Sequence, residues 1–391
     1  MLSAIHRTRK SLGQIILVLF AVVLSACVPA TGPVGSQGGG RGDTVQVALL
    51  IPSGSGQSQD EIFGQNLENA ARLAMADLSG VTIDLRVYRT GGNPAQARAM
   101  ATQAVNEGAK VILGPFYSEE ANAAAVAVSA SGVNVLAFSN NAAIAGGNLF
   151  VLGQTFDNTA KRLANYAVRN GKNKILIVHD RNLAGEVGKT AIERGVSNAG
   201  GTVVGVASYE VSQNGIVQAA PAIVQTARSS GATAMFFTAD TALSLPLLSQ
   251  LLIDNGIDNA STQFIGLTRW DNPPAALALP GVQGGWFALP DPGLYGQFQA
   301  RYRSAYGQAP NPVAGLAYDG IAAIGALARQ GRGDNLDRGA LTQGAGFAGV
   351  TGVFRFLPNG TNERGLAVAQ IRGGQVVVVD PAPRGFGGAG F

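Results

Sequence analysis

Short runs of apolar, often β-branched residues alternate with amphipathic helical stretches along most of this chain of 391 residues, and this alternation constrains the fold more than any other feature. Strands that are separated by helices pair in parallel, and parallel sheets are covered by helices on both faces. The strand runs form two successive sets, the first at 45–51, 83–88, 110–114, 134–138 and 149–153, and the second at 174–180, 202–209, 234–239 and 263–267. Two sets predict two α/β lobes, in a chain long enough to bury two cores.

The stretches between these strands carry helix signals. In 62–78, Leu67 and Leu78, with two alanines between them, fall on one helical face. A second helix is predicted to open at Pro94, because proline is favoured at the first helical position. A third is expected over 118–131.

The last third of the chain differs from the rest. A strand at 284–290 is followed by predicted helices near 295–306 and 312–329. Three further strands, at 353–356, 366–372 and 375–380, look like hairpins, with a Pro-Asn-Gly turn at 358–360. Residues 381–391 are predicted to be a loose tail.

The first 26 residues have the pattern of a secretory signal. Arg7, Arg9 and Lys10 form a basic opening, and an unbroken apolar run follows at 15–24. Ten helical residues span about half of a bilayer core, so the run is too short for an ordinary transmembrane helix. A basic start, a short apolar run and small residues before a cut site are typical of a signal peptide.

The only cysteine of the chain, Cys27, comes directly after this segment. Leu24-Ser25-Ala26-Cys27 resembles the lipobox of bacterial lipoproteins, which implies an acylated Cys27 at the start of the mature protein. A plain signal peptide cut a few residues later is the alternative. A lone exported thiol has no disulfide partner, which favours the anchor. After Cys27, the Gly-, Pro- and Ser-rich stretch to residue 44 predicts a flexible tether spanning about 20 Å.

Charge gives no support to nucleic-acid binding. The formal net charge of +4 includes three basic residues of the signal segment, which contains no acid, so its removal leaves +1. The remaining Lys and Arg residues are scattered along the sequence, whereas nucleic-acid-binding proteins gather them on one face. We therefore expect no nucleic-acid partner.

Catalysis is not expected either. Once the signal is removed, His179 is the only histidine, so the usual zinc sites have too few ligands. No G-x-S-x-G motif is present, and the stretch 183–190 has Leu183 where a phosphate-binding loop needs its first glycine. The sequence predicts no enzyme, no cofactor and no metal, and His179 is expected to pack at a strand end.

Four stretches, at 69–78, 114–141, 175–201 and 315–327, resemble in this order the leucine-binding-type periplasmic binding proteins, and the likeness covers nearly all of 45–380. The resemblance implies a type I periplasmic-binding fold, in which three crossovers join two doubly wound α/β lobes and a ligand cleft lies between them. Transferred to this chain, lobe I comprises 45–153 plus 288–348, and lobe II comprises 154–287 plus 349–380.

The resemblance also implies where a ligand binds. A serine matching Ser118 and the amides of its helix hold a ligand carboxylate in the family, although Ser118 is also a plausible simple N-cap. Asn141 stands where the family has a threonine, and an amide can make similar hydrogen bonds. Arg269 and Trp270 follow a strand at the end where open α/β sheets bind ligands. The predicted ligand-binding residues are Ser53, Phe63, Ser118, Asn140, Asn141, Asp180, Arg269 and Trp270.

Two functions remain open. One is a lipoprotein regulator resembling the activators of penicillin-binding proteins, which are peptidoglycan synthases. The other is the substrate-binding component of an ABC importer for amino acids or related amides, acting with a permease. Ala184 replaces the family's usual aromatic ligand contact, and 349–371 resembles the end of the activator-like lipoproteins, so the regulator is preferred. The short tether before the binding fold opposes it, because well-known activators carry a helical-repeat domain there.

The location is expected to be the periplasmic face of a bacterial envelope. Val28, which follows Cys27, differs from the aspartate that marks inner-membrane retention in some bacteria, so the outer membrane is preferred. In a Gram-positive cell, the same anchor would favour the importer.

Overall fold

The computed structural model describes residues 44–387, and its first sheet is formed by residues 44–151. The signal peptide, Cys27, the tether up to 43 and residues 388–391 lie outside the described part. All strands of the first sheet pair in parallel, in the order β2-β1-β3-β4-β5. They are β1 (Thr44–Ile51), β2 (Thr82–Arg89), β3 (Val111–Leu113), β4 (Asn134–Ala137) and β5 (Leu149–Val151). Each coincides with a predicted strand run.

Helices cover both faces of this sheet because its strands bury side chains on both sides. Val47 and Leu49 of β1 pack in one core, and Ala48 and Leu50 pack in the other. The first core is closed by α1 (Ser58–Ala76), and the second by α2 (Pro94–Asn106) and α3 (Ser118–Val128). The short, exposed turn η1 (Ser129–Ser131) follows α3. A second short turn, η2 (Ala142–Ile144), follows β4. The proline expected to open α2 does so, after Asn93 accepts two backbone N–H bonds as its N-cap.

The second sheet has seven strands in the order β15-β14-β10-β9-β8-β6-β7. Its parallel strands are β6 (Lys174–Asp180), β7 (Thr202–Tyr209), β8 (Ala234–Phe237), β9 (Gln263–Gly266) and β10 (Trp286–Leu289). β14 (Ala367–Arg372) and β15 (Gln375–Asp380) complete it in antiparallel pairing. The helices are α4 (Phe156–Arg169), α5 (Leu183–Asn198), α6 (Gln213–Ser230) and α7 (Ser244–Asp254), with the turns η3 (Pro274–Ala278) and η4 (Pro280–Val282).

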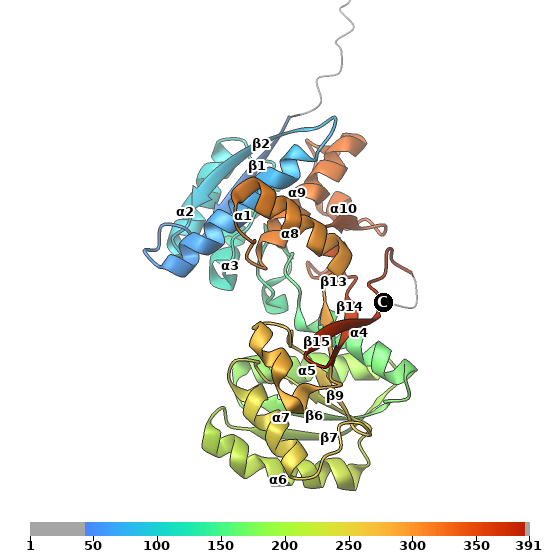
Figure 1. The fold of residues 1–391 in the computed structure, drawn as a ribbon. Coiled ribbons are helices and arrows are strands. Elements are labelled where there is room, and N and C mark those ends of the chain that lie inside the picture. Colours follow the sequence, from blue (N-terminus) through green and yellow to red (C-terminus); the bar gives the residue numbers. More distant parts are fainter. Residues whose placement is uncertain (1–43, 388–391) are drawn as a thin grey trace, which may run out of the picture. The chain divides into compact units, whose positions relative to one another are not determined.

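After β10 the chain returns to the first sheet. α8 (Pro292–Tyr306) and α9 (Ala314–Leu327) pack with α1 in the first core, as Figure 1 shows, and η5 (Ala328–Arg332) and α10 (Arg338–Leu341) follow. A small antiparallel sheet comes next, formed by β11 (Phe347–Gly349), β12 (Gly352–Phe356) and β13 (Asn362–Arg364). The chain therefore crosses between the two large sheets three times, after β5, after β10 and after β13. Two doubly wound sheets with three crossovers confirm the expected fold class.

The lobe boundaries differ from the expected ones at both ends of this return. Residues 349–364 were assigned to lobe II, but the rings of Phe356 in β12 and Phe150 in β5 meet edge to face at 5.5 Å, inside the core of the first sheet. Residues 288 and 289 were assigned to lobe I, but they pair in the second sheet. The third crossover thus follows Arg364, because the buried aromatic side chains of β12 hold this hairpin against the first core.

The predicted loose tail is packed over the part that is described. Ala382 is buried in the core of the second sheet, and the carbonyl of Pro381 accepts a hydrogen bond of 3.2 Å from Nη2 of Arg162. The guanidinium of Arg355 lies 4.5 Å from the centre of the Phe386 ring. These contacts correct the expectation for 381–387.

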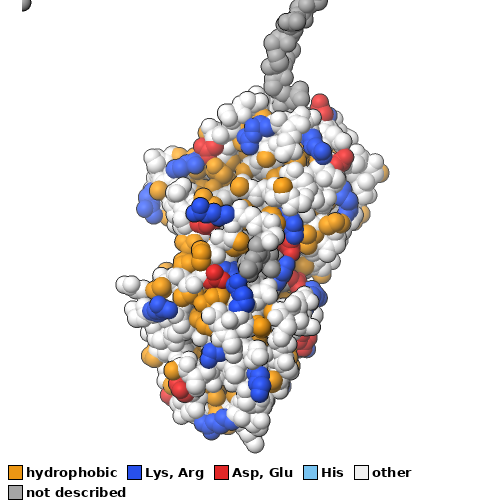
Figure 2. Space-filling view, turned by 90° about the vertical axis from the view of Figure 1, so that its right-hand side faces the viewer, with side chains coloured by type: hydrophobic (Ala, Val, Ile, Leu, Met, Phe, Trp, Pro, Cys, Tyr) orange, Lys and Arg blue, Asp and Glu red, His pale blue; other side chains and the backbone are white. Residues whose placement is uncertain are grey.

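Within residues 44–387, no helix is long and apolar enough to cross a membrane. On the face shown in Figure 2, Lys and Arg side chains are spread over the surface and do not gather into one patch. This distribution agrees with the scattered charges of the sequence.

Candidate functional site

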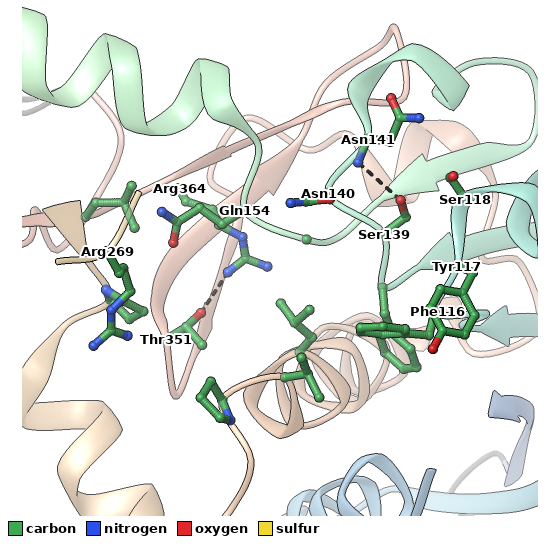
Figure 3. A pocket seen from close by; sticks show the side chains of 17 residues that line it. Phe116, Tyr117, Ser118, Ser139, Asn140, Asn141, Gln154, Arg269, Thr351 and Arg364 are labelled. Atoms are coloured by element: carbon green, nitrogen blue, oxygen red, sulfur yellow. Dashed lines mark hydrogen bonds between the residues drawn. The ribbon is translucent and has the colours of Figure 1, made fainter. Parts of the chain in front are cut away.

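A central cavity of about 430 Å³ lies where the three crossovers meet the ends of β4 and β9 (Figure 3). All three crossovers contribute to its wall. Its lining residues are Phe116, Tyr117, Ser118, Phe138, Ser139, Asn140, Asn141, Gly153, Gln154, Arg269, Pro290, Pro312, Val313, Leu316, Thr351, Arg364 and Leu366. Four of the eight predicted ligand-binding residues are among them: Ser118, Asn140, Asn141 and Arg269.

Ser118 lies at the amino end of α3, where the helix leaves its first N–H groups uncapped. The N-cap position is occupied by Tyr117, whose side chain makes no capping hydrogen bond. Such an end attracts an anion, although the exposed Glu119 in the same first turn opposes one. The loop before it turns at Gly114, which has a φ of +94° and approaches Leu50 so closely that a Cβ would lie 2.2 Å from its carbonyl oxygen.

Asn140 and Asn141 follow β4, on the loop that borders the cavity. Asn140 is exposed, whereas Asn141 has its side-chain oxygen engaged with the N–H of Ala143 at 3.0 Å. The backbone N–H of Asn141 donates to Oγ of Ser139 at 3.1 Å, and both side chains border the cavity in Figure 3. Asn141 can therefore offer a ligand its amide N–H groups and the second lone pair of its side-chain oxygen.

Within the described part of the chain, the charged side chains in the wall of the cavity are two guanidinium groups. Arg269 follows β9 and donates through Nε to Oδ1 of Asp271 at 2.8 Å, with Nη2 on the other carboxylate oxygen. Its side chain remains about one third exposed. Arg364, at the third crossover, is almost fully buried. No acidic side chain among residues 44–387 lines the cavity, and the carboxylates that pair with the two guanidinium groups, those of Asp271 and Asp319, lie behind its wall. The wall therefore offers guanidinium N–H donors, which suit a carboxylate, and little net positive charge.

Arg364 belongs to a buried network that ties the crossovers together. Its Nη1 lies 3.1 Å from Oδ2 of Asp319 on α9 and donates to Oγ1 of Thr351 at 2.7 Å. Its Nε donates to the carbonyl of Leu152, just before the first crossover, at 3.2 Å. The N–H of Val350 donates to Oδ1 of Asp319 at 2.8 Å. Burial raises the pKa of Asp319, and the charge of Arg364 opposes that shift.

Trp270 was predicted to contact a ligand, and the structure contradicts this. Its indole is fully buried in the core of the second sheet, 6.3 Å from the ring of Phe237 between centroids. Gly266 and Gly285 lie so near that a Cβ on either would come within 2.2 Å of the indole. The side chain turns inward because these two glycines leave the space for it, so Trp270 does not reach the cavity.

Three other predicted residues lie outside the central cavity. Ser53 is buried against Gly64 of α1, where a Cβ would lie 2.0 Å from its Oγ. Phe63 lies behind the wall, with its ring centroid 4.8 Å from that of Phe116. Asp180 is buried at the end of β6, where it accepts a hydrogen bond from the hydroxyl of Tyr209, and burial raises its pKa.

Sequence reasoning missed several wall residues. Gln154 directly follows the predicted strand 149–153, so the rule that ligands meet strand ends could have identified it. Thr351 and Arg364 carried no such signal, because the hairpin that presents them was placed in the wrong lobe. Phe116 and Tyr117 lie inside a stretch that carried the resemblance, but only Ser118 was selected from it.

The residues of the described range 44–387 include no cluster of three or more His, Cys, Asp or Glu side chains placed to hold a metal ion. His179 is buried at the end of β6, as expected, with Nδ1 3.1 Å from the carbonyl oxygen of Asp180. Nδ1 also lies 3.6 Å from Oε1 of Glu186. These contacts explain the position of His179 by packing and hydrogen bonding, as the sequence predicts.

Among solved structures, the fold is similar to that of a protein from Rhodospirillum rubrum assigned to branched-chain amino acid ABC transport. The two are 19% identical with a TM-score of 0.72, over 86% of this chain and 100% of the other. A solute-binding protein of an ABC transporter from Rhodopseudomonas palustris BisB5, in complex with 3,4-dihydroxybenzoic acid, is 18% identical with a TM-score of 0.58, over 87% and 96%. At such identities, the likeness shows the fold.

In sequence, the chain is 26% identical over 122 residues to the uncharacterized protein RP748 of Rickettsia prowazekii (strain Madrid E). That match covers 31% of this chain and 32% of the relative, so it spans about a third of each. The family model described as periplasmic binding protein matches residues 44–375, which is nearly all of the described chain. The resemblance to the leucine-binding type is thereby confirmed, and the chain belongs to the periplasmic binding protein family.

Proposed function

We propose that this protein is a non-catalytic binding protein whose central cavity holds a small organic anion for an ABC permease. The observation that carries this proposal is the set of donors in the cavity wall, where the described lining residues include two guanidinium groups, Arg269 and Arg364, and no carboxylate. The uncapped end of α3 at Ser118 adds N–H donors of the kind that bind a carboxylate.

The other lining residues indicate what the remainder of the ligand should be like. Phe116, Phe138, Val313, Leu316 and Leu366 offer apolar surface, and a site that mixes such surface with a few polar groups is typical of small-molecule recognition. The Rhodopseudomonas palustris protein was solved with an aromatic carboxylic acid, and the Rhodospirillum rubrum protein is assigned to amino acids, so both names point to carboxylates. We propose a carboxylate with an apolar or aromatic body.

Thermal unfolding of residues 28–391 against a ligand panel tests this proposal, since this fragment keeps the compact unit of residues 42–391 whole. The panel contains aromatic carboxylates, branched-chain amino acids and the neutral amide of each. A ligand at about a hundred times its dissociation constant stabilises the folded state by about 2.7 kcal/mol, which raises the melting temperature by several degrees. A shift with acids and none with their amides supports the proposal. The absence of any shift contradicts it.

A regulator of penicillin-binding proteins is the second candidate, and one observation favours it. Leu183 and Leu243 lie beyond the carboxyl ends of the neighbouring strands β6 and β8 of the second sheet. Their exposed fractions are 82% and 69%. The exposed Ala184 beside them replaces the aromatic residue that usually grips a ligand. Exposed apolar side chains at one edge suit contact with a protein partner.

This second function is tested by cross-linking in the envelope. The wild-type protein and the variant Leu183→Asp/Leu243→Asp are compared for adducts with penicillin-binding proteins, with Val378→Asp as the control on exposed β15. Adducts lost only in the double variant support the regulator. A deletion strain that grows poorly on particular acids, yet tolerates cell-wall antibiotics normally, supports the importer.

For either function we propose a lipid anchor at Cys27, in the outer membrane in preference to the inner one. The support is the lipobox-like sequence 24–27 and Val28 after the cysteine. Mass spectrometry of the mature protein tests the anchor by the added acyl mass, which Cys27→Ser removes. Separation of the two membranes by density then tests the location, and a soluble, unmodified mature chain would refute the anchor.

A further inference from the structure

A second hollow, of about 520 Å³, lies in the first lobe between the amino ends of α1 and α3 and the loop after β2. It shares Tyr117 and Ser118 with the central cavity. Three carboxylates, those of Asp60, Glu119 and Glu120, line this hollow, and none of its ten lining residues is basic. We call it the acidic recess. The described lining of the central cavity has the opposite composition, with two guanidinium groups and no carboxylate.

Glu120 is the unusual member of the acidic recess. Its side chain is completely buried, and neither carboxylate oxygen has a hydrogen-bond partner. The hydroxyl of Thr90 already donates to the carbonyl of Ile51 at 3.0 Å. This hydroxyl and the backbone N–H groups of Tyr117 and Asn93 lie near enough to favour the charged form of Glu120, but they do not offset its burial. A buried carboxylate without a partner destabilises the folded state. A residue that served only the fold would be apolar here, so Glu120 indicates a ligand with hydrogen-bond donors.

Asp60 supplies a second acceptor to the recess. It is buried, and its Oδ1 accepts a hydrogen bond from the hydroxyl of Tyr117. Its Oδ2 lies on the side of Gly92, where a Cβ would come within 3.3 Å of that oxygen and 3.7 Å of the Tyr117 ring. Gly92 has a φ of +66°, which favours glycine, so the turn keeps the space in front of Asp60 open.

The occupant has to be a cation of a particular kind. The carboxylates of the recess are not placed to hold a metal ion, since no such cluster occurs within residues 44–387. An ammonium group instead presents three N–H donors that can reach separate acceptors. The Tyr117 ring borders the recess and packs 5.0 Å from the Phe116 ring between centroids, and aromatic rings attract organic cations.

We propose that the acidic recess binds an organic ammonium group, which donates hydrogen bonds to Asp60 and Glu120. The ammonium belongs either to a separate amine, such as a diamine, or to a ligand whose carboxylate lies in the central cavity. The second source rests on the proposed function. Tyr117 and Ser118, which border both hollows, would then lie between the two ends of one ligand.

Isothermal titration of residues 28–391 with putrescine, hexanoate and 6-aminohexanoate tests the proposal. Putrescine carries only ammonium groups, hexanoate only a carboxylate, and 6-aminohexanoate carries one of each. Wild-type protein binds at least one of the two amines, and Glu120→Gln weakens that binding by about tenfold or more, because a charged hydrogen-bond partner is lost. Asp254→Asn, an equal loss of charge at the exposed end of α7, leaves binding unchanged.

The ligand-free variant adds a readout that a purely structural role would not give. Without ligand, Glu120→Gln melts at a higher temperature than the wild type, because the buried unpaired charge is gone. A residue kept for the fold would instead lower the melting temperature when changed. Higher stability together with weaker amine binding therefore identifies a ligand-binding carboxylate.

The three probes also separate the two sources of the ammonium group. Binding of putrescine by itself indicates a separate amine. Binding of 6-aminohexanoate but not putrescine, with an advantage over hexanoate that Glu120→Gln removes, indicates the ligand of the central cavity. Hexanoate binding without any effect of an amine overturns the recess and leaves the proposed function intact. Putrescine binding without any binding of the two carboxylates supports the recess and contradicts the proposed function. If none of the three probes binds, both proposals are contradicted.

Discussion

Nη1 of Arg364 lies 3.1 Å from Oδ2 of Asp319, and both side chains are almost completely removed from solvent. Arg364 opens the third crossover, and its bond to the carbonyl of Leu152 reaches the first. Asp319 belongs to α9, a helix in the core of the first sheet. One ion pair thus fixes two connections between the sheets at the wall of the central cavity.

Removal of one member of this pair should strongly destabilise the fold. Arg364→Met leaves Asp319 as a buried carboxylate without its cation, and the loss of such a partner costs about 3–5 kcal/mol in the free energy of unfolding. Urea unfolding measures the loss. Arg372→Met, an exposed position on β14, should change stability by less than about 0.5 kcal/mol.

The double variant Arg364→Met/Asp319→Asn checks the cause. If the cost comes from the unpaired charge, the double variant is more stable than the sum of the single changes predicts, with a coupling energy of about 0.5–3 kcal/mol. Simple additivity would show that the two residues act independently and would contradict the assignment.

The stability effect of Glu120 should depend on pH. Burial raises the pKa of its carboxyl above the ordinary value of about 4.3. Between the unfolded and the folded pKa, the folded state binds more protons than the unfolded state, so stability falls as the pH rises through this window. Chemical unfolding should show Glu120→Gln to be more stable than wild type at neutral pH by about 1–3 kcal/mol, the cost of a buried polar group without hydrogen bonds.

This difference between Glu120→Gln and the wild type should shrink as the pH falls through the same window, and it should be lost below about 4.3, where both states of the wild type carry a neutral carboxyl. Glu119→Gln serves as the matched control, because that side chain is exposed in the same helical turn. If both variants gained the same stability, the cause would be charge repulsion at the helix end, and the burial of Glu120 would not be the cause.

Trp270 should matter for stability and not for ligand binding. Trp270→Phe removes part of an indole that packs against two glycines in the core of the second sheet, which should lower the free energy of unfolding by about 1–3 kcal/mol. The dissociation constant of any cavity ligand should remain within about twofold. A large loss of affinity in a variant that is still folded would restore Trp270 as a ligand contact.

Arg269→Gln should have the opposite profile. The guanidinium is about one third exposed, so its loss should change stability by no more than about 1 kcal/mol. A carboxylate in the central cavity would lose a charge-assisted partner, and its affinity should fall by about tenfold in titration calorimetry. Arg372→Gln is the matched control, and equal effects of both changes would indicate only long-range attraction.

Much of the fold could be read from periodicity and local signals. Each predicted strand of the two sheets is present because β-branched runs buried on both faces are distinctive, and α2 begins at Pro94 because proline is favoured at the first helical position. Ser118 and Arg269 could be placed at the cavity wall by the rule that ligand sites lie at the carboxyl ends of parallel strands. Local sequence was sufficient for these residues.

Other assignments depended on contacts between distant segments, which no local pattern encodes. The sequence of the hairpin 352–364 predicts strands but does not indicate which lobe they join. The contact between Phe356 and Phe150 places the hairpin in the first core. That contact also brings Arg364 to the cavity wall. Trp270 turns inward because Gly285, fifteen positions later, leaves room for the indole. The sequence by itself determined the elements and their order, whereas tertiary packing decided which side chains line the central cavity, because burial depends on neighbours that are remote in sequence.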